Sequence, residues 1–175
     1  MIRNWFLPII VGLIVAAIAW HGTLVATPYV LMSKAMERIG GRAAVNSFGF
    51  GKLNTADNQP IVRPSPDLVY SSCVFDVSEG PVLIDVPSVP DSYWSVSIFD
   101  ARTDVAKVVS VRENGDKPAR LVLHHEDMQL EMVPGYEPVA LKHDKGIALI
   151  RIWVTDPSRY PAIDGIRRKS RCERG

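Results

Sequence analysis

The 175-residue sequence lacks the short motifs that identify the common kinds of enzyme active site. It has no glycine-rich phosphate-binding loop, no nucleophile elbow, no Cys-x-x-Cys pair and no His-Glu-x-x-His helix. Because these motifs are absent, the sequence does not specify a reaction. We therefore expect no cofactor.

Neither sign of charge is in excess, and cysteine and histidine are scarce. The formal net charge of +1 gives no electrostatic reason to expect nucleic acid as a partner. His124 and His125 are adjacent at the end of a predicted strand, where neighbouring side chains point to opposite faces, and a zinc site would need a third ligand such as His143. We predict no metal site.

Residues 5–26 form a long apolar stretch without charged side chains. About 20 helical residues cross the hydrocarbon core of a bilayer, and Trp5 and Trp20 suit its interfaces. Residues 1–27 are therefore an uncleaved membrane anchor or a signal peptide cleaved after Ala19. We favour the anchor, with the lipid bilayer as its partner, because the apolar character continues past Ala19.

Residues 28–45 are predicted to form a separate amphipathic connector helix. Thr27 is placed as its N-cap, Pro28 as its first residue, and Gly40-Gly41 as its end. Its apolar residues recur at helical spacing: Tyr29, Met32, Met36 and Ile39. The helix either packs on the following domain or lies on the membrane surface.

Residues 46–66 are predicted to be a loop, and alternating apolar residues then predict seven short strands. They span residues 69–77, 82–86, 93–99, 105–111, 119–124, 138–142 and 147–154. The first two are expected to form a hairpin, and the last, apolar on both faces except at Arg151, to be central. This pattern predicts a mainly β protein, an antiparallel, jelly-roll-like β-sandwich over residues 46–160. Residues 161–175 are expected to be a basic, solvated tail, with contact to anionic lipid or a partner as the alternative.

Several residues in and around these strands carry a resemblance to a known family. They are Ser65-Pro66-Asp67, Tyr70-Ser71, Asp76, Gly80-Pro81, Pro87, Tyr93 and Asp100. The pattern covers roughly residues 57–111, and more loosely 147–156, and resembles the bacterial family called domain of unknown function 1254. The chain looks like a short, membrane-anchored member of that family.

The resemblance implies an exported β-sandwich without an established reaction. The family is commonly associated with a second domain of unknown function, numbered 1214, which this chain is too short to include. The resemblance therefore implies a separately encoded companion protein of family 1214. It also favours a single-pass inner-membrane protein whose domain faces the periplasm.

Five polar residues are candidates for a ligand pocket: Asp67, Tyr70, Tyr93, Asp100 and Arg151. The resemblance implies that the first four cluster near one end of the sandwich. Arg151 lies among apolar neighbours, and a buried guanidinium needs a carboxylate, so we expect an aspartate beside it. The alternative is that the aspartates only cap turns.

Cys73 falls on the core face of its strand, and Cys172 lies near the C-terminus. They either form a disulfide, which would require an oxidising compartment, or remain two unrelated thiols.

Two functions remain open from the sequence. The first, which we favour, is a non-catalytic, membrane-anchored envelope protein that binds a partner. The second is a small-ligand-binding protein or enzyme that uses the polar pocket at one end of the sandwich.

Overall fold

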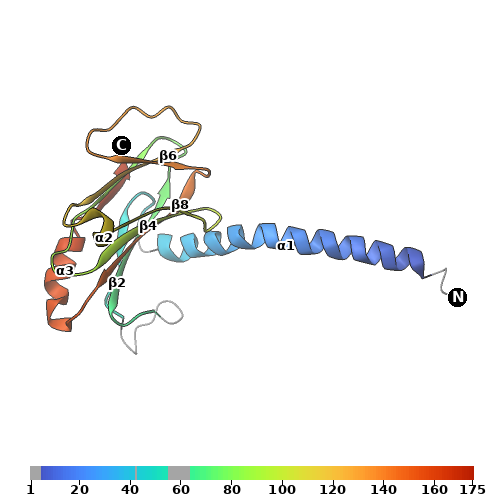
Figure 1. Cartoon of the computed structure of the whole chain (residues 1–175), viewed down its shortest axis with the longest axis horizontal. Coiled ribbons are helices and arrows are strands. Elements are labelled where there is room, and N and C mark those ends of the chain that lie inside the picture. Colours follow the sequence, from blue (N-terminus) through green and yellow to red (C-terminus); the bar gives the residue numbers. More distant parts are fainter. Residues whose placement is uncertain (1–4, 42, 55–63) are drawn as a thin grey trace.

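The computed structural model describes residues 5–41, 43–54 and 64–175. A long helix, α1 (Phe6–Gly40), precedes a compact region of strands (Figure 1). The strands are β1 (Phe48–Phe50), β2 (Leu68–Asp76), β3 (Val82–Val86), β4 (Trp94–Asp100), β5 (Val105–Ser110), β6 (Ala119–His125), β7 (Glu137–Leu141), β8 (Lys145–Trp153) and β9 (Arg171–Arg174). Three short helical segments complete the chain: α2 (Val111–Asn114), η2 (Pro157–Arg159) and α3 (Tyr160–Arg167).

The strands form two sheets that pack face to face. One has five strands in the order β1-β2-β8-β4-β5, and the other has four in the order β7-β6-β3-β9. Alternate side chains of both sheets meet in one core, which includes Phe75, Trp94, Ile150, Ile84 and Leu121. The predicted sandwich is confirmed, and so is the central place of β8, between β2 and β4. One pair, β6 with β7, is parallel.

The predicted hairpin between the first two strands is wrong. Strand β2 pairs with β1 and β8, whereas β3 pairs with β6 and β9 in the other sheet. The turn at Gly80 and Pro81 therefore carries the chain from one sheet to the other. Alternation identifies the core face of a strand but not its neighbour, so both pairings satisfy the same pattern.

The C-terminal residues belong to the folded domain, which corrects the expectation of a solvated tail. Helix α3 buries Ile163 and Arg167, and β9 extends the four-stranded sheet beside β3. The burial of these C-terminal elements was not predictable from the sequence, because charged residues flank single buried residues such as Cys172. Strand β1 was also missed, since three residues are too few to show an alternating pattern.

Helix α1 is continuous, so the separate connector helix predicted from residue 28 is wrong. Pro28 lies inside it, and the Thr27 hydroxyl donates to the Thr23 carbonyl at 2.7 Å instead of capping a new helix. An internal proline removes one backbone hydrogen bond, a loss that long apolar helices tolerate. The helix ends at Gly40, as predicted.

Only the C-terminal end of α1 packs on the sandwich (Figure 1). Met32 is buried there, with Met36 and Ile39 beside it, against Val74 of β2 and Ile147 of β8. The remaining apolar length extends away from the domain and is long enough to cross a membrane. A signal sequence would have the same length and composition, so the helix is a membrane anchor or a signal sequence.

Gly146 of β8 lies where the core has no room for a side chain. A Cβ atom there would be 2.1 Å from the Phe99 carbonyl oxygen and 2.5 Å from the Phe75 ring. We expect Gly146→Ala to lower the free energy of unfolding by about 3 kcal/mol, because backbone and core must both shift. Urea unfolding of the full chain in detergent, followed by tryptophan fluorescence, measures this.

Gly165 of α3 supplies the matched control, because a Cβ atom added there would have no described neighbour within 4 Å. Gly165→Ala should leave the stability unchanged or raise it by up to about 1 kcal/mol, since alanine favours helix. Equal stabilities of the two variants would contradict the tight packing at Gly146.

Candidate functional site

The outer face of the five-stranded sheet is the face that points away from the four-stranded sheet. Along β8, Ile147, Arg151 and Trp153 lie on this face, while Ile150 and Ile152 point into the core. Helix α1 packs at the Ile147 end. Arg151 and Trp153 lie toward the opposite end of the strand.

Four residues on this face form what we call the Arg151 cluster: Tyr70, Ser95, Ser97 and Arg151. Tyr70 of β2 and Ser95 of β4 flank Arg151 in register on its two sides. The Arg151 Nη2 donates to the Ser97 hydroxyl at 3.1 Å. Both serines are buried, whereas Tyr70 and Arg151 are half-buried. The cluster therefore places a cation among hydroxyl groups in the middle of a sheet.

We predicted that an aspartate lies beside Arg151, and this prediction is wrong for the part of the chain that the structure describes. No described carboxylate lies within 4.0 Å of its guanidinium. Its Nε and the Ser95 hydroxyl are also buried without a hydrogen-bond partner among the described residues.

The structure brings four of the five predicted pocket residues to one end of the sheet. The carbonyls of Asp67 and Tyr93 accept from the backbone N–H groups of Val154 and Trp153, next to Arg151 and Tyr70. Asp100 does not join them. It pairs with Gly146, five residues from Arg151 along β8, or about 16 Å at ~3.3 Å per residue. Tyr93 directly precedes β4 and Asp100 is its last residue, so the strand keeps them apart.

Asp100 instead organises the turn after β4 and its contact with α1. Its Oδ1 accepts from the backbone N–H groups of Arg102 (2.8 Å) and Asp104 (3.1 Å). Its Oδ2 lies 3.0 Å from Nδ1 of His143, and Nε2 of that ring lies 3.1 Å from the Tyr29 hydroxyl. With Nδ1 donating to Asp100, a neutral His143 accepts from Tyr29. This chain of bonds holds the helix against the sandwich.

A cavity of about 320 Å³ opens beside this junction. Its lining consists of Asp100, Asp104, Val105, Ala106, Ala140, Leu141 and Lys142. Asp100 is the one residue that this cavity shares with the predicted pocket, and its carboxylate is already occupied by the turn and by His143.

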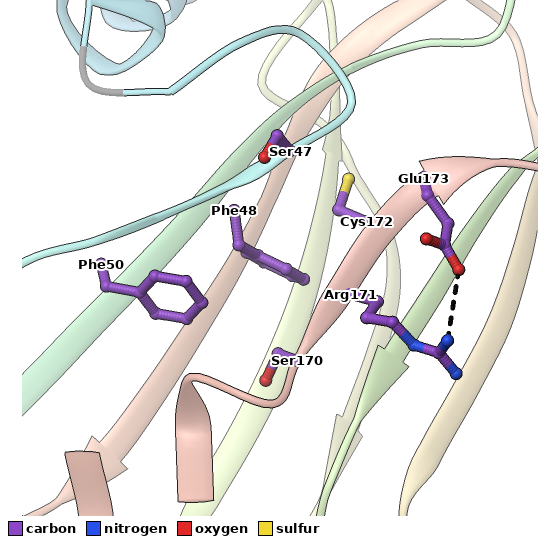
Figure 2. A pocket seen from close by; sticks show the side chains of 7 residues that line it. All are labelled: Ser47, Phe48, Phe50, Ser170, Arg171, Cys172 and Glu173. Atoms are coloured by element: carbon purple, nitrogen blue, oxygen red, sulfur yellow. Dashed lines mark ion pairs between the residues drawn. The ribbon is translucent and has the colours of Figure 1, made fainter. Parts of the chain in front are cut away.

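Cys73 and Cys172 are joined by a disulfide that crosses between the two sheets. Both side chains are buried. A shallow cavity of about 180 Å³ lies next to Cys172, and Figure 2 shows its lining side chains, with the Phe48 and Phe50 rings side by side. Arg171 and Glu173, drawn there as an ion pair, lie at the edge of this cavity. The lining therefore combines two aromatic rings with one ion pair at the edge.

Arg167 of α3 was missed by the sequence reasoning, although its side chain is fully buried. Its Nη1 donates to the Ser71 hydroxyl (2.8 Å) and the Tyr70 carbonyl (3.1 Å). Its Nη2 donates to the Gly51 carbonyl at 2.6 Å and forms an ion pair with Asp164. The i,i+3 spacing of Asp164 and Arg167 was visible in the sequence, but their burial was not.

The pKa of the Asp164 carboxyl is lowered. Partial burial acts to raise this pKa, but the hydrogen bond from Arg168 and the charge of Arg167 outweigh it. The Arg168 Nε lies 2.7 Å from the carboxylate and is exposed, whereas Arg167 is buried. Asp164 therefore stays ionised and neutralises a buried guanidinium. We interpret this group as structural.

Comparison with one solved structure supports the fold. The VPA0106 protein from Vibrio parahaemolyticus has a TM-score of 0.71 and 15% sequence identity, over 87% of this chain and 36% of its own. A putative uncharacterized protein from Burkholderia cenocepacia has a TM-score of 0.49 and 16% identity, over 74% of this chain and 35% of its own. This chain thus spans little more than a third of the length of either protein. No curated protein matches it.

The sequence model of the family described as "Protein of unknown function (DUF1254)" matches residues 45–174. These residues are most of the chain and nearly all of the sandwich. The match begins after α1 and extends the resemblance seen in residues 57–111 to the C-terminal strand. The chain belongs to the DUF1254 family of proteins of unknown function.

Proposed function

We propose that this chain is a single-pass inner-membrane protein that holds a non-catalytic binding domain in the periplasm. The domain binds a separately encoded companion protein of family 1214. The observation that carries this proposal is the outer face of the five-stranded sheet, where the half-buried Arg151 has no carboxylate partner among the described residues and Trp153 is 47% exposed. Exposed aromatic residues and arginine are typical of protein interfaces.

The anchor and the disulfide support the location. Helix α1 is exposed and apolar over a length sufficient to cross a bilayer. The bridge between Cys73 and Cys172 suits an oxidising compartment, because cytosolic thiols are kept reduced. A signal peptide cleaved after Ala19 would remove most of the apolar length, and the released domain would then lack its anchor.

The alternative function, a small-ligand or catalytic pocket, has less support. It placed Asp100 in one pocket with Tyr93 and Arg151, but Asp100 pairs with Gly146, near the other end of β8. Ligand sites are usually concave, and the 320 Å³ cavity at Asp100 lies away from the Arg151 cluster. Binding of a protein surface therefore suits the geometry better.

Affinity capture of the tagged full chain from solubilised membranes tests the proposal. We expect a family 1214 protein to co-purify in about equal amount. Residues 1–45 fused to the same tag are the control, because they keep α1 and lack the sandwich. Recovery of no such protein, or equal recovery with the control, would overturn the companion proposal.

The orientation has its own test. A reporter that is active only after export, fused after Gly175, should be active, and one that fluoresces only in the cytoplasm should not. The opposite pattern would overturn the periplasmic location.

A further inference from the structure

The charge of Arg151 is not balanced within the described structure. Its guanidinium has five N–H donors, and the single described hydrogen bond is the one from Nη2 to Ser97. Its Nη1 makes no hydrogen bond to a described residue, and Nε is buried without a partner there. A half-buried cation of this kind is stabilised when a carboxylate approaches its fork of donors.

Arg167 has a structural role, and its guanidinium is much better paired than that of Arg151. The Arg167 Nε is also buried without a described partner, but its two Nη atoms contact Asp164 and three further oxygen acceptors from Gly51, Tyr70 and Ser71. Arg151 lies in the same region of the sheet, paired in register with Tyr70. Its one described hydrogen-bond acceptor is the Ser97 hydroxyl. The contrast indicates that the missing acceptor comes from outside the described residues.

The surroundings of Arg151 suit a protein partner. Trp153 is 47% exposed and Tyr93 37% exposed at the same end of the sheet. The Arg112 guanidinium lies 5.9 Å from the Tyr93 ring centroid, and it too has no carboxylate partner in the described residues. Exposed aromatic residues and arginine dominate the energetic centres of protein interfaces.

We propose that this face docks a protein partner that presents an aspartate or glutamate carboxylate to the Arg151 guanidinium. The proposal rests on the proposed function, because it assigns the surface on which the companion binds. The carboxylate accepts from the two Nη atoms, and the partner covers Trp153 and Tyr93. Two arginines on one face, neither with a carboxylate among the described residues, give the charge complementarity for an acidic group.

Carbodiimide coupling in membranes that contain the companion gives the first test. Carbodiimide joins an amine to a carboxylate, whereas arginine does not react. The Arg151→Lys chain should therefore gain one cross-link, from the substituted side chain to an aspartate or glutamate of the companion. The wild-type chain should lack it. Coupling at other lysines only, or retention of anionic lipid without a protein cross-link, would overturn the proposal.

Affinity for the companion and stability of the chain give the second test. Arg151→Met should weaken binding by about tenfold or more, while its resistance to urea equals or exceeds that of wild type, because an unpaired half-buried charge is removed. Arg168→Gln, on the exposed side of α3, is the control and should bind as wild type does. Unchanged binding by Arg151→Met would overturn this inference alone. Failure of wild type to bind would overturn the proposed function.

Discussion

Replacing both cysteines, in a Cys73→Ser/Cys172→Ser variant, is expected to lower the free energy of unfolding by about 4 kcal/mol. The two residues are 99 positions apart, so the bridge closes a long loop and removes much of the entropy of the unfolded chain. It also joins β2 of one sheet to β9 of the other. Strand β9 is a four-residue edge strand whose one neighbour among the described strands is β3, so it depends on this link.

Urea unfolding of the full chain in detergent measures the loss. Wild-type chain treated with dithiothreitol should unfold at the same urea concentration as the double variant, since both lack the bridge. The untreated wild type, once denatured, should react with no thiol reagent. A double variant as stable as the oxidised wild type would show that β9 is held by its other contacts.

The loss of stability should be greatest in β9. Without the bridge, amide hydrogens of β9 should exchange faster than those of β3, because an edge strand opens more easily than an inner one. The Arg174 side chain pairs with Glu79 at 2.6 Å, but both are exposed and hold the strand only weakly. The disulfide therefore adds to the pairing of β9 with β3 a restraint that the exposed ion pair cannot replace.

The sequence was sufficient to predict most strands, for a physical reason. A half-buried strand must alternate, and β2 to β8 lie within two residues of the ranges predicted from alternation. Pairing was not predictable in the same way, because alternation is compatible with several neighbours. Strand β3 thus satisfied a hairpin pattern but belongs to the other sheet.

The candidate site was predictable in part. Arg151 stood out as a charge within an apolar strand, and the structure places Tyr70 beside it. The separation of Asp100 from Tyr93 could have been foreseen, since Tyr93 directly precedes the seven-residue strand β4 and Asp100 is its last residue. The lack of a described aspartate partner for Arg151 could not, because it depends on how β2, β4 and β8 meet. The same holds for Arg167, whose acceptors come from residues far away in the sequence.

Arg167→Met is expected to lower the free energy of unfolding by about 3–5 kcal/mol, as does removal of one partner from other buried ion pairs. The change leaves Asp164 without its buried cation, and the carbonyls of Gly51 and Tyr70 lose their donor. Arg168→Gln is the matched control, since Arg168 contacts the same carboxylate from the exposed side. Its loss should stay below about 1 kcal/mol. Equal losses from the two variants would contradict the assigned role of Arg167.

The pH dependence of stability tests whether the ion pair between Asp164 and Arg167 causes this loss. The lowered pKa of Asp164 means that its contribution is fully present above the unfolded pKa of about 3.9 and is lost as the pH falls through the folded value. The difference between wild type and Arg167→Met should therefore shrink as the solution is acidified below about pH 4. A double variant, Asp164→Leu/Arg167→Met, should recover part of the stability, because it leaves no unpaired charge. If it is as unstable as the single variant, the hydrogen bonds of Arg167 to β2 and the segment after β1, rather than its charge, hold α3 in place.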